Sequence, residues 1–275
     1  MPPPEKIFVY EIEGKVNPPA GLTEADFLGC WREGDYTYLF FSRQMEAQVQ
    51  AWVTVPGRGR YSSETVLNYA DWEAGQAFKP AGIAGFHLCP IWETPHPAPG
   101  EIVLKMEPGL AFGSGHHPTS RLCLQLLRQV YDRDTPREVL DLGTGTGILA
   151  LAAMALGARR VVAVDYNDLA ARAAARNVRH NRREVEILLI QGEARDFAHL
   201  PADLSLANIH LDVLLDLLTI PEFLRHQRHI FSGIRGTQIE KFKEALKASP
   251  LEVVEILDEN LWFAVLTENG GYANE

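Results

Sequence analysis

The chain has 275 residues, of which 46% are apolar and 23% charged, a composition typical of a globular protein with one large or two small domains. No apolar run approaches the roughly 18 residues that span a bilayer, and the N-terminus lacks the features of a signal peptide, so we expect a cytoplasmic protein without membrane contact. The net charge of -10 argues against direct nucleic-acid binding, and three widely spaced cysteines suggest neither a disulfide framework nor a zinc site.

Residues 1–66 have the composition of a small α+β domain, with aromatic and β-branched residues between glycine and charged turns. We predict a short helix over residues 23–30, capped by Thr23. Strands are predicted over residues 7–10, 36–41 and 49–55. Nothing in this segment resembles a catalytic site. It is either a stability or dimerisation module or a substrate-docking domain.

Residues 67–100 contain the expected connection between two domains. A helix followed by a strand is predicted over residues 68–91, and the three prolines of residues 94–100 mark an irregular segment. A strand over residues 102–106 follows. We therefore place the second domain at residues 101–275.

A glycine-rich, weakly charged stretch, EPGLAFGSGHHPTS, precedes an amphipathic helix predicted over residues 121–131. Thr119 and Ser120 stand at the start of this helix, where hydroxyl groups commonly cap backbone N–H groups. His116 and His117 lack a metal-binding partner at suitable spacing, so we expect no metal. We expect a loop that folds over a ligand, with a simple helix entry as the structural alternative.

Residues 138–165, EVLDLGTGTGILALAAMALGARRVVAVD, have the pattern strand, glycine turn, helix and strand. Gly143, Gly145 and Gly147 permit a tight turn and a close approach of the backbone to a ligand. Asp165 ends the second strand, where its carboxylate can accept hydrogen bonds from ribose hydroxyls. This pattern predicts a site for a nucleoside-bearing cofactor, with an ordinary βαβ turn as the alternative.

The spacing of the glycines indicates which cofactor is bound. A dinucleotide fingerprint has the form G-x-G-x-x-G, whereas here G-x-G-x-G directly follows the Asp141-Leu142 pair and Ile148 takes the place of a third glycine. This form resembles the first motif of methyltransferases that use S-adenosylmethionine (AdoMet). It disfavours a dehydrogenase, and we expect AdoMet as the methyl donor.

The remaining segments alternate between helix and strand. Helices are predicted over residues 167–181, 211–218 and 237–248, and strands over residues 185–190, 203–207, 229–232, 251–257 and 261–266. The strand over residues 203–207 leads directly to Asn208. Because ligands bind outside the carboxyl ends of strands in open α/β sheets, Gly143, Asp165 and Asn208 should converge. The last two strands form a predicted antiparallel hairpin that completes a seven-stranded sheet.

Several segments are distinctive together: DWEAGQAFKP with CPIW, the EPGLAFGSGHHPTS stretch, VLDLGTGTGILALAA, the Ala207-Asn208-Ile209 strand end, Ser232-Gly233-Ile234 and Trp262. On these segments the chain resembles the ribosomal protein L11 methyltransferase family over most of residues 71–266. The resemblance implies an α/β fold in which a Rossmann-like, seven-stranded class I methyltransferase domain follows a small α+β recognition domain. It also implies ribosomal protein L11 as the protein partner.

The resemblance implies methylation of lysine ε-amines of L11, with an N-terminal α-amine as a candidate second acceptor. Asn208 would be the catalytic residue, since its side-chain oxygen can accept the N–H bonds of the amine and aim its lone pair. The expected contacts with AdoMet are Phe112, Thr119, Ser120, Gly143, Gly145, Asp165 and Asn208. A methyltransferase for another protein or a small molecule and a non-catalytic AdoMet-binding protein are the alternatives.

The chain departs from the family pattern in three places. Ser120 stands where the family has threonine, which keeps the hydroxyl and loses a methyl group. Residues 224–230, LRHQRHI, replace a Pro-Gly-Gly turn, so we expect an altered connection and a shifted edge of the site there. Residues 1–66 carry little similarity, and the identity of the substrate is therefore the least constrained expectation.

Overall fold

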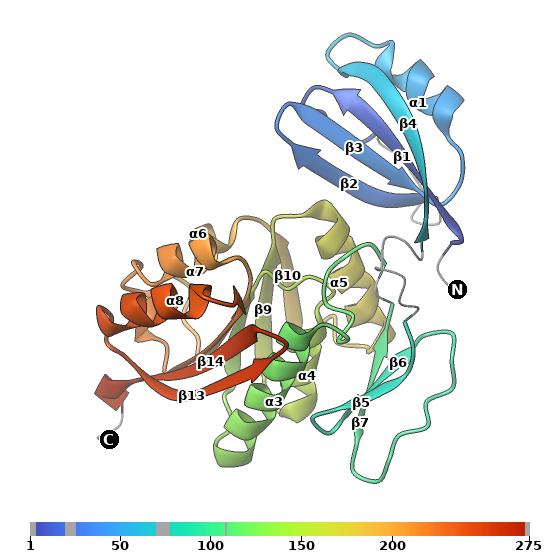
Figure 1. Ribbon diagram of the computed structural model, residues 1–275. Helices are drawn as coiled ribbons and strands as arrows, with labels where there is room; N and C mark the ends of the chain where they lie inside the picture. Colours follow the sequence, from blue (N-terminus) through green and yellow to red (C-terminus); the bar gives the residue numbers. More distant parts are fainter. Residues whose placement is uncertain (1–3, 20–25, 70–77, 108, 273–275) are drawn as a thin grey trace.

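The computed structural model describes residues 4–19, 26–69, 78–107 and 109–272, and their strands form three sheets (Figure 1). The N-terminal sheet has four strands in the order β2-β3-β1-β4, and a middle sheet has three in the order β5-β6-β7. The largest has seven strands in the order β10-β9-β8-β11-β12-β14-β13. No helix in the described part of the chain is both long and apolar enough to cross a membrane.

The N-terminal sheet is antiparallel, with a single helix on one face (Figure 1). Its elements are β1 (Lys6–Glu13), β2 (Phe27–Glu33), β3 (Tyr36–Phe41), α1 (Glu46–Val53) and β4 (Arg60–Asn68). The helix packs Val49 into a cluster with Tyr10 and Phe41 of the sheet. The predicted strands over residues 7–10 and 36–41 are confirmed.

Two predictions in this region are wrong. Residues 49–53 of the predicted strand belong to α1, where Val49 is the buried residue and the β-branched content is overridden by packing on the sheet. Residues 27–30 of the predicted helix belong to β2, while residues 23–25 lie outside the described residues. A register shift between Phe27 and Gly29 buries both Phe27 and Cys30, and this three-residue spacing imitates a helical period.

The middle sheet consists of β5 (Ala81–Ile83), β6 (Phe86–Pro90) and β7 (Ile102–Met106). The predicted strand over residues 102–106 is confirmed, and it pairs in parallel with β6. Phe86, Leu88 and Met106 are fully buried and pack in the same cluster as the helices that cover the seven-stranded sheet. The helix predicted at the start of residues 68–91 falls mainly on residues outside the described ranges.

The seven-stranded sheet confirms the Rossmann-like prediction. Its strands are β8 (Glu138–Leu142), β9 (Arg160–Asp165), β10 (Ile187–Gln191), β11 (Leu204–Asn208), β12 (Arg228–Arg235), β13 (Leu251–Glu259) and β14 (Trp262–Asn269). The first five run parallel, and β14 lies antiparallel between β12 and β13 as the predicted hairpin.

Helices cover both faces of this sheet (Figure 1). They are α3 (Pro118–Arg133), α4 (Ile148–Leu156), α5 (Asp168–His180), α6 (Ala194–Phe197), α7 (Leu211–Leu217) and α8 (Gln238–Lys247), with short 3₁₀ turns η1 (Phe223–Arg225) and η2 (Gly270–Tyr272). Alternate strand residues enter opposite cores: Val139 packs with α3 and α4, and Leu140 packs with α7 and α8. Burial on both faces explains why the central strands β8, β9 and β11 are nearly continuous apolar runs.

The N-terminal sheet contacts the start of α5. The Cys30 backbone N–H donates to the Asp168 carboxylate at 3.0 Å, and the Arg172 guanidinium lies 5.0 Å from the Phe27 ring centroid. Leu169 packs in a buried cluster with Val9 of β1. Because α5 directly follows β9, these contacts place the N-terminal sheet next to the carboxyl end of the large sheet.

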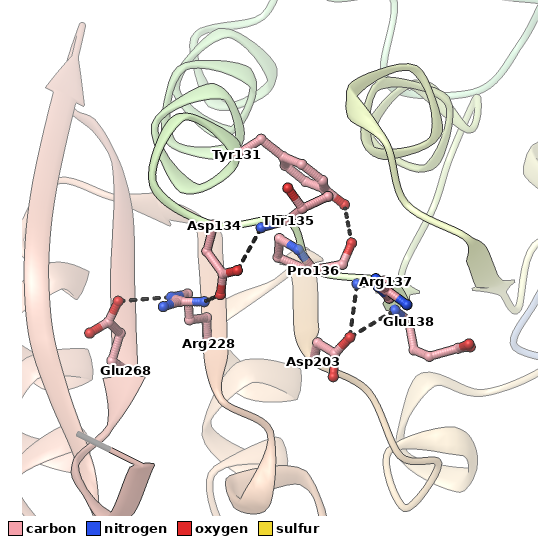
Figure 2. Close-up of polar contacts among 9 residues, drawn as sticks. All are labelled: Tyr131, Asp134, Thr135, Pro136, Arg137, Glu138, Asp203, Arg228 and Glu268. Atoms are coloured by element: carbon pink, nitrogen blue, oxygen red, sulfur yellow. Dashed lines mark hydrogen bonds and ion pairs between the residues drawn. The ribbon is translucent and has the colours of Figure 1, made fainter. Parts of the chain in front are cut away.

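A polar network holds the opposite, amino end of the large sheet (Figure 2). The Asp203 carboxylate accepts backbone N–H bonds from Arg137 and Glu138 at 2.8 and 3.0 Å. Arg228 pairs with Asp134 at 2.7 Å and with Glu268 at 2.8 Å. These contacts tie the starts of β8, β11 and β12 to the end of the antiparallel strand β14.

The LRHQRHI segment contributes to this amino end. His226 is buried, its Nε2–H donates to the Leu200 carbonyl at 2.8 Å, and its Nδ1 accepts from the Ser205 hydroxyl. Burial lowers the pKa of His226 from its ordinary value, which favours the neutral ring. The altered connection therefore lies before β12, at the opposite end of the sheet from Gly233 and Asn208, and the expectation that it shifts the edge of the site is wrong.

Candidate active site

The glycine turn after β8 forms the floor of the site. Gly143, Gly145 and Gly147 all have positive φ angles, of 76°, 57° and 82°. A Cβ on Gly143 would lie 1.9 Å from Cγ2 of Ile209, and one on Gly145 would lie 2.3 Å from the Phe112 carbonyl oxygen. The glycines are therefore required by the approach of two other loops as well as by the turn itself.

A cavity of about 370 Å³ opens at the carboxyl ends of the parallel strands. Six of the seven predicted cofactor contacts line it: Phe112, Thr119, Gly143, Gly145, Asp165 and Asn208. Ser120 is absent from this lining. It is fully buried at the start of α3, and its hydroxyl has no hydrogen-bond partner among the described residues. The cavity thus brings together residues up to 96 positions apart, from Phe112 to Asn208, and the strand-end rule accounts for Gly143, Asp165 and Asn208 among them.

Asp165 is held in place by two backbone N–H groups. Gly145 donates to its Oδ2 and Asn167 to its Oδ1, each at 2.9 Å. Burial raises the pKa of Asp165 above its ordinary value, while these two hydrogen bonds oppose the shift and Glu193 adds to it. Each carboxylate oxygen keeps a further lone pair with which it can accept a hydroxyl group in the cavity.

A second carboxyl group, Asp141, lies under the turn. It is 1% exposed, it accepts from the Thr144 hydroxyl at 2.5 Å, and its Oδ1 has no partner among the described residues. Burial, with a smaller contribution from Asp165, raises the pKa of Asp141 to about 7. With Glu193 on the cavity wall, these carboxyl groups favour a ligand that carries positive charge.

An aromatic wall, formed by Phe112, His117 and Trp262, stands beside the cavity. The His117 ring centroid lies 5.0 Å from that of Phe112 and 4.9 Å from that of Trp262. The Thr119 N–H donates to His117 Nδ1 at 3.3 Å, so His117 caps α3 and lines the cavity at once. Burial and the nearby Arg121 lower the pKa of His117, which keeps the ring neutral at pH 7. Among the described residues, no cluster of histidine, cysteine or carboxylate side chains could hold a metal ion.

Asn208 ends β11 at the cavity wall. Its side chain has no hydrogen-bond partner in the described part of the chain and can accept one from a ligand. The next residue is fixed, because the Ile209 N–H donates to the Ser232 carbonyl at 3.2 Å. A Cβ on Gly233 would lie 2.1 Å from the Ile209 oxygen, so glycine is required there for the two strand ends to meet.

Other cavity residues were not singled out as contacts from the sequence. Tyr166 and Glu193 line the cavity just beyond β9 and β10, and the same strand-end rule that identified Asp165 could have found them. Trp262 comes from the β13–β14 hairpin. Its approach to His117 depends on tertiary packing, for which the sequence carries no local signal.

Comparison with known proteins agrees with this geometry. The model of the family described as ribosomal protein L11 methyltransferase (PrmA) matches residues 40–269. The ribosomal protein L11 methyltransferase of Alkaliphilus oremlandii is 34% identical over 220 residues, which cover 78% of this chain and 69% of the relative. That of Exiguobacterium sibiricum is 36% identical over 214 residues, which cover 74% of this chain and 66% of the relative.

Among solved structures, the ribosomal protein L11 methylase of Lactobacillus delbrueckii subsp. bulgaricus has a TM-score of 0.60 and 31% sequence identity. The match covers 67% of this chain and 95% of that one. The chain thus spans about two thirds of the length of the curated relatives, and residues 1–39 precede the family match. The chain belongs to the ribosomal protein L11 methyltransferase family.

Proposed function

We propose that this protein transfers methyl groups from AdoMet to lysine ε-amines of ribosomal protein L11, with an N-terminal α-amine as a second acceptor. The observation that carries the proposal is the unpaired carboxamide of Asn208, which faces a cavity with a buried carboxylate on its other side. In this proposal residues 1–66 recognise the substrate, residues 67–100 connect, and residues 101–275 catalyse. The reaction takes place in the cytoplasm, where ribosomal proteins are made.

The residues of the cavity suit AdoMet. Asp165 would accept the ribose hydroxyls, and the backbone of Gly143 and Gly145 would hold the methionine part. Phe112 and Thr119 would close the cavity from the loop before α3. When bound, AdoMet supplies an electrophilic methyl group on a positively charged sulfur, and the carboxyl groups around and beneath the cavity complement that charge.

The amine must lose a proton before it can attack. A lysine with a pKa near 10.4 lies about 3.4 units above pH 7, a cost of roughly 4.6 kcal/mol, and an α-amine near 8 costs roughly 1.4 kcal/mol. A neighbouring positive charge and removal from water both lower the pKa of the amine. The proton can leave to water before the amine enters, so the reaction requires no protein base.

Orientation is the contribution we assign to the protein. The Asn208 oxygen would accept an N–H bond of the neutral amine and aim its lone pair at the methyl group, which is worth several kcal/mol when two reactants are aligned. The aromatic wall would contact the methylated product, because an alkylammonium group is attracted to an aromatic face. Trp262 and Asn208 both line the cavity, as this arrangement requires.

The test is label transfer from methyl-labelled AdoMet to L11 purified from cells that lack the enzyme. Asn208→Ala should lower kcat at least about 100-fold, or roughly 2.7 kcal/mol, and change the AdoMet Kd less than about threefold. Asn208→Asp, which keeps an accepting oxygen, should retain more activity than Asn208→Ala. Absence of label transfer while AdoMet binds would refute L11 as substrate, and equal losses in kcat and AdoMet affinity would refute the role of Asn208.

A further inference from the structure

The face of the N-terminal sheet opposite α1 carries a groove of about 230 Å³. Two rows of side chains cross neighbouring strands there. The upper row is Glu11, Tyr38 and Trp31, which pair directly across β1, β3 and β2. The lower row includes Val9 and Phe40, which are paired in the same way and form the apolar floor.

The groove continues the face that contacts the catalytic part of the chain. Gly29 stands at the end of the lower row, and a Cβ on it would lie 2.6 Å from Cδ2 of Leu169. Leu169 and Leu110 cover one end of this face, where they cluster with Val9, and both also line the cofactor cavity. Leu110 and Leu169 therefore lie between the groove and the cavity and contact both.

The Glu33 carboxylate of the groove also acts on a residue of the cavity. Glu33 lines the groove, and Tyr166, which is 63% exposed, lines the cavity. The pKa of the Tyr166 hydroxyl is raised first by burial and then by Asp165, Glu193 and Glu33. Glu33 is thus close enough to act electrostatically on a residue of the cofactor site.

The chemistry of the groove favours a cation on an apolar stem. Its only charged lining residues within the described chain are Glu11 and Glu33, and both act on the Tyr38 hydroxyl between them, whose pKa is raised by burial and by these two carboxylates. The Glu11 carboxylate is positioned by a 2.7 Å hydrogen bond from the Ser62 hydroxyl. The Trp31 and Tyr38 ring centroids lie 6.5 Å apart at 53°. Aromatic faces beside carboxylates suit the head and methylene stem of lysine or arginine.

We propose that this groove docks a basic, extended segment of the protein substrate, with a lysine or arginine side chain held by Trp31, Tyr38 and the Glu11 and Glu33 carboxylates. The inference rests on the proposed function and adds to it the surface that selects the substrate. Charge complementarity is the argument for this occupant. Most of the groove belongs to residues 9–38, which precede the family match at residue 40.

The first test is the double variant Glu11→Gln/Glu33→Gln. We expect KM for L11 to rise at least about tenfold, with kcat and AdoMet Kd unchanged, and the difference from the parent to shrink as salt is raised. The matched control is Glu184→Gln/Glu222→Gln, which removes two exposed carboxylates outside the groove and should leave KM unchanged. A short lysine peptide too small to reach the groove should be methylated equally by both double variants.

Direct binding of L11, measured by fluorescence anisotropy, separates this inference from the proposed function. Binding by the parent without label transfer would refute methyl transfer only, and weaker binding by the groove variant would still support the groove. Equal binding by parent and groove variant would overturn the groove, as would failure of the parent to bind L11. Trp31→Ala should weaken binding to a similar degree, with a thermal melt to confirm its fold. If the groove variant changes only the oligomeric state, measured by sedimentation velocity, then the groove face joins two copies of the chain and the inference fails.

Discussion

The two largest sheets of the molecule expose different parts of their strands. In the seven-stranded sheet, helices cover both faces, and the cavity of about 370 Å³ opens at the strand ends. In the N-terminal sheet, α1 buries one face, while the other is partly covered by Leu110 and Leu169 and is open along the groove. Strand ends can gather polar groups from distant loops around one small molecule. A strand face presents a regular row of side chains, which suits an extended chain.

The strand ends of the large sheet hold buried carboxyl groups that lower the stability of the fold. Replacing Asp141 should change the free energy of unfolding more than any other substitution considered. Folding raises its pKa from 3.8 to about 7, so the folded protein keeps a proton that the unfolded chain releases. The native state therefore loses stability as pH rises from about 4 to 7. Asp141→Asn should raise the free energy of unfolding at pH 8 by up to roughly 4 kcal/mol.

Urea unfolding of the parent and of Asp141→Asn at pH 8 and pH 4.5 checks the direction of this effect. The gain in the free energy of unfolding should shrink toward pH 4. The variant should also bind AdoMet more weakly at pH 8, since a negative charge beneath the cavity is lost. It should bind the uncharged thioether product, S-adenosylhomocysteine, with a smaller change. A gain in stability that is larger at acid pH would contradict the argument.

The second prediction compares one glycine from each sheet. Gly143→Ala should weaken AdoMet binding at least about 30-fold, or roughly 2 kcal/mol, because its φ is 76° and the added Cβ would overlap Ile209. Gly34, in the turn between β2 and β3, has a φ of 56° and open space around it. Gly34→Ala should cost about 1 kcal/mol of stability and leave AdoMet affinity unchanged.

Calorimetric titration measures the AdoMet Kd of both variants, and thermal melts measure their stability. If Gly34→Ala reduced AdoMet affinity as much as Gly143→Ala, the glycine requirement would belong to the whole molecule rather than to the strand end.

The centre of the large sheet was predictable because β8, β9 and β11 are buried on both faces. Such strands are compact apolar runs, and their ends locate Asp165 and Asn208 without further information. The helix predicted over residues 167–181 is also found, and its N-cap is Asn167, whose side chain accepts from the Leu169 N–H at 2.9 Å. The role of each of these residues toward AdoMet stays a prediction.

The N-terminal sheet was less predictable for physical reasons. The shift at Gly29 in β2 breaks the alternation on which strand prediction depends. In α1, Val49 is the buried residue, so no helical stripe of apolar residues appears in the sequence. The groove itself depends on the register of three strands. Register is a property of the folded sheet, and the spacing between Glu11, Trp31 and Tyr38 in the chain does not reveal it.

The smallest expected effect is the difference in stability cost when a valine is replaced by alanine in each of the two sheets. Val161 in β9 is fully buried among the helices, whereas Val9 in β1 is 8% exposed and borders the groove. Val161→Ala should lower the free energy of unfolding by about 2 kcal/mol, from the lost methyl groups and the cavity left in a core closed on both faces. Val9→Ala should cost about 1 kcal/mol, because water can enter from the groove and no sealed cavity forms. Urea unfolding of the two variants measures the difference. Equal costs would mean that the groove face is as closed as the core of the large sheet, and that a docked segment would have to displace packed side chains to enter it.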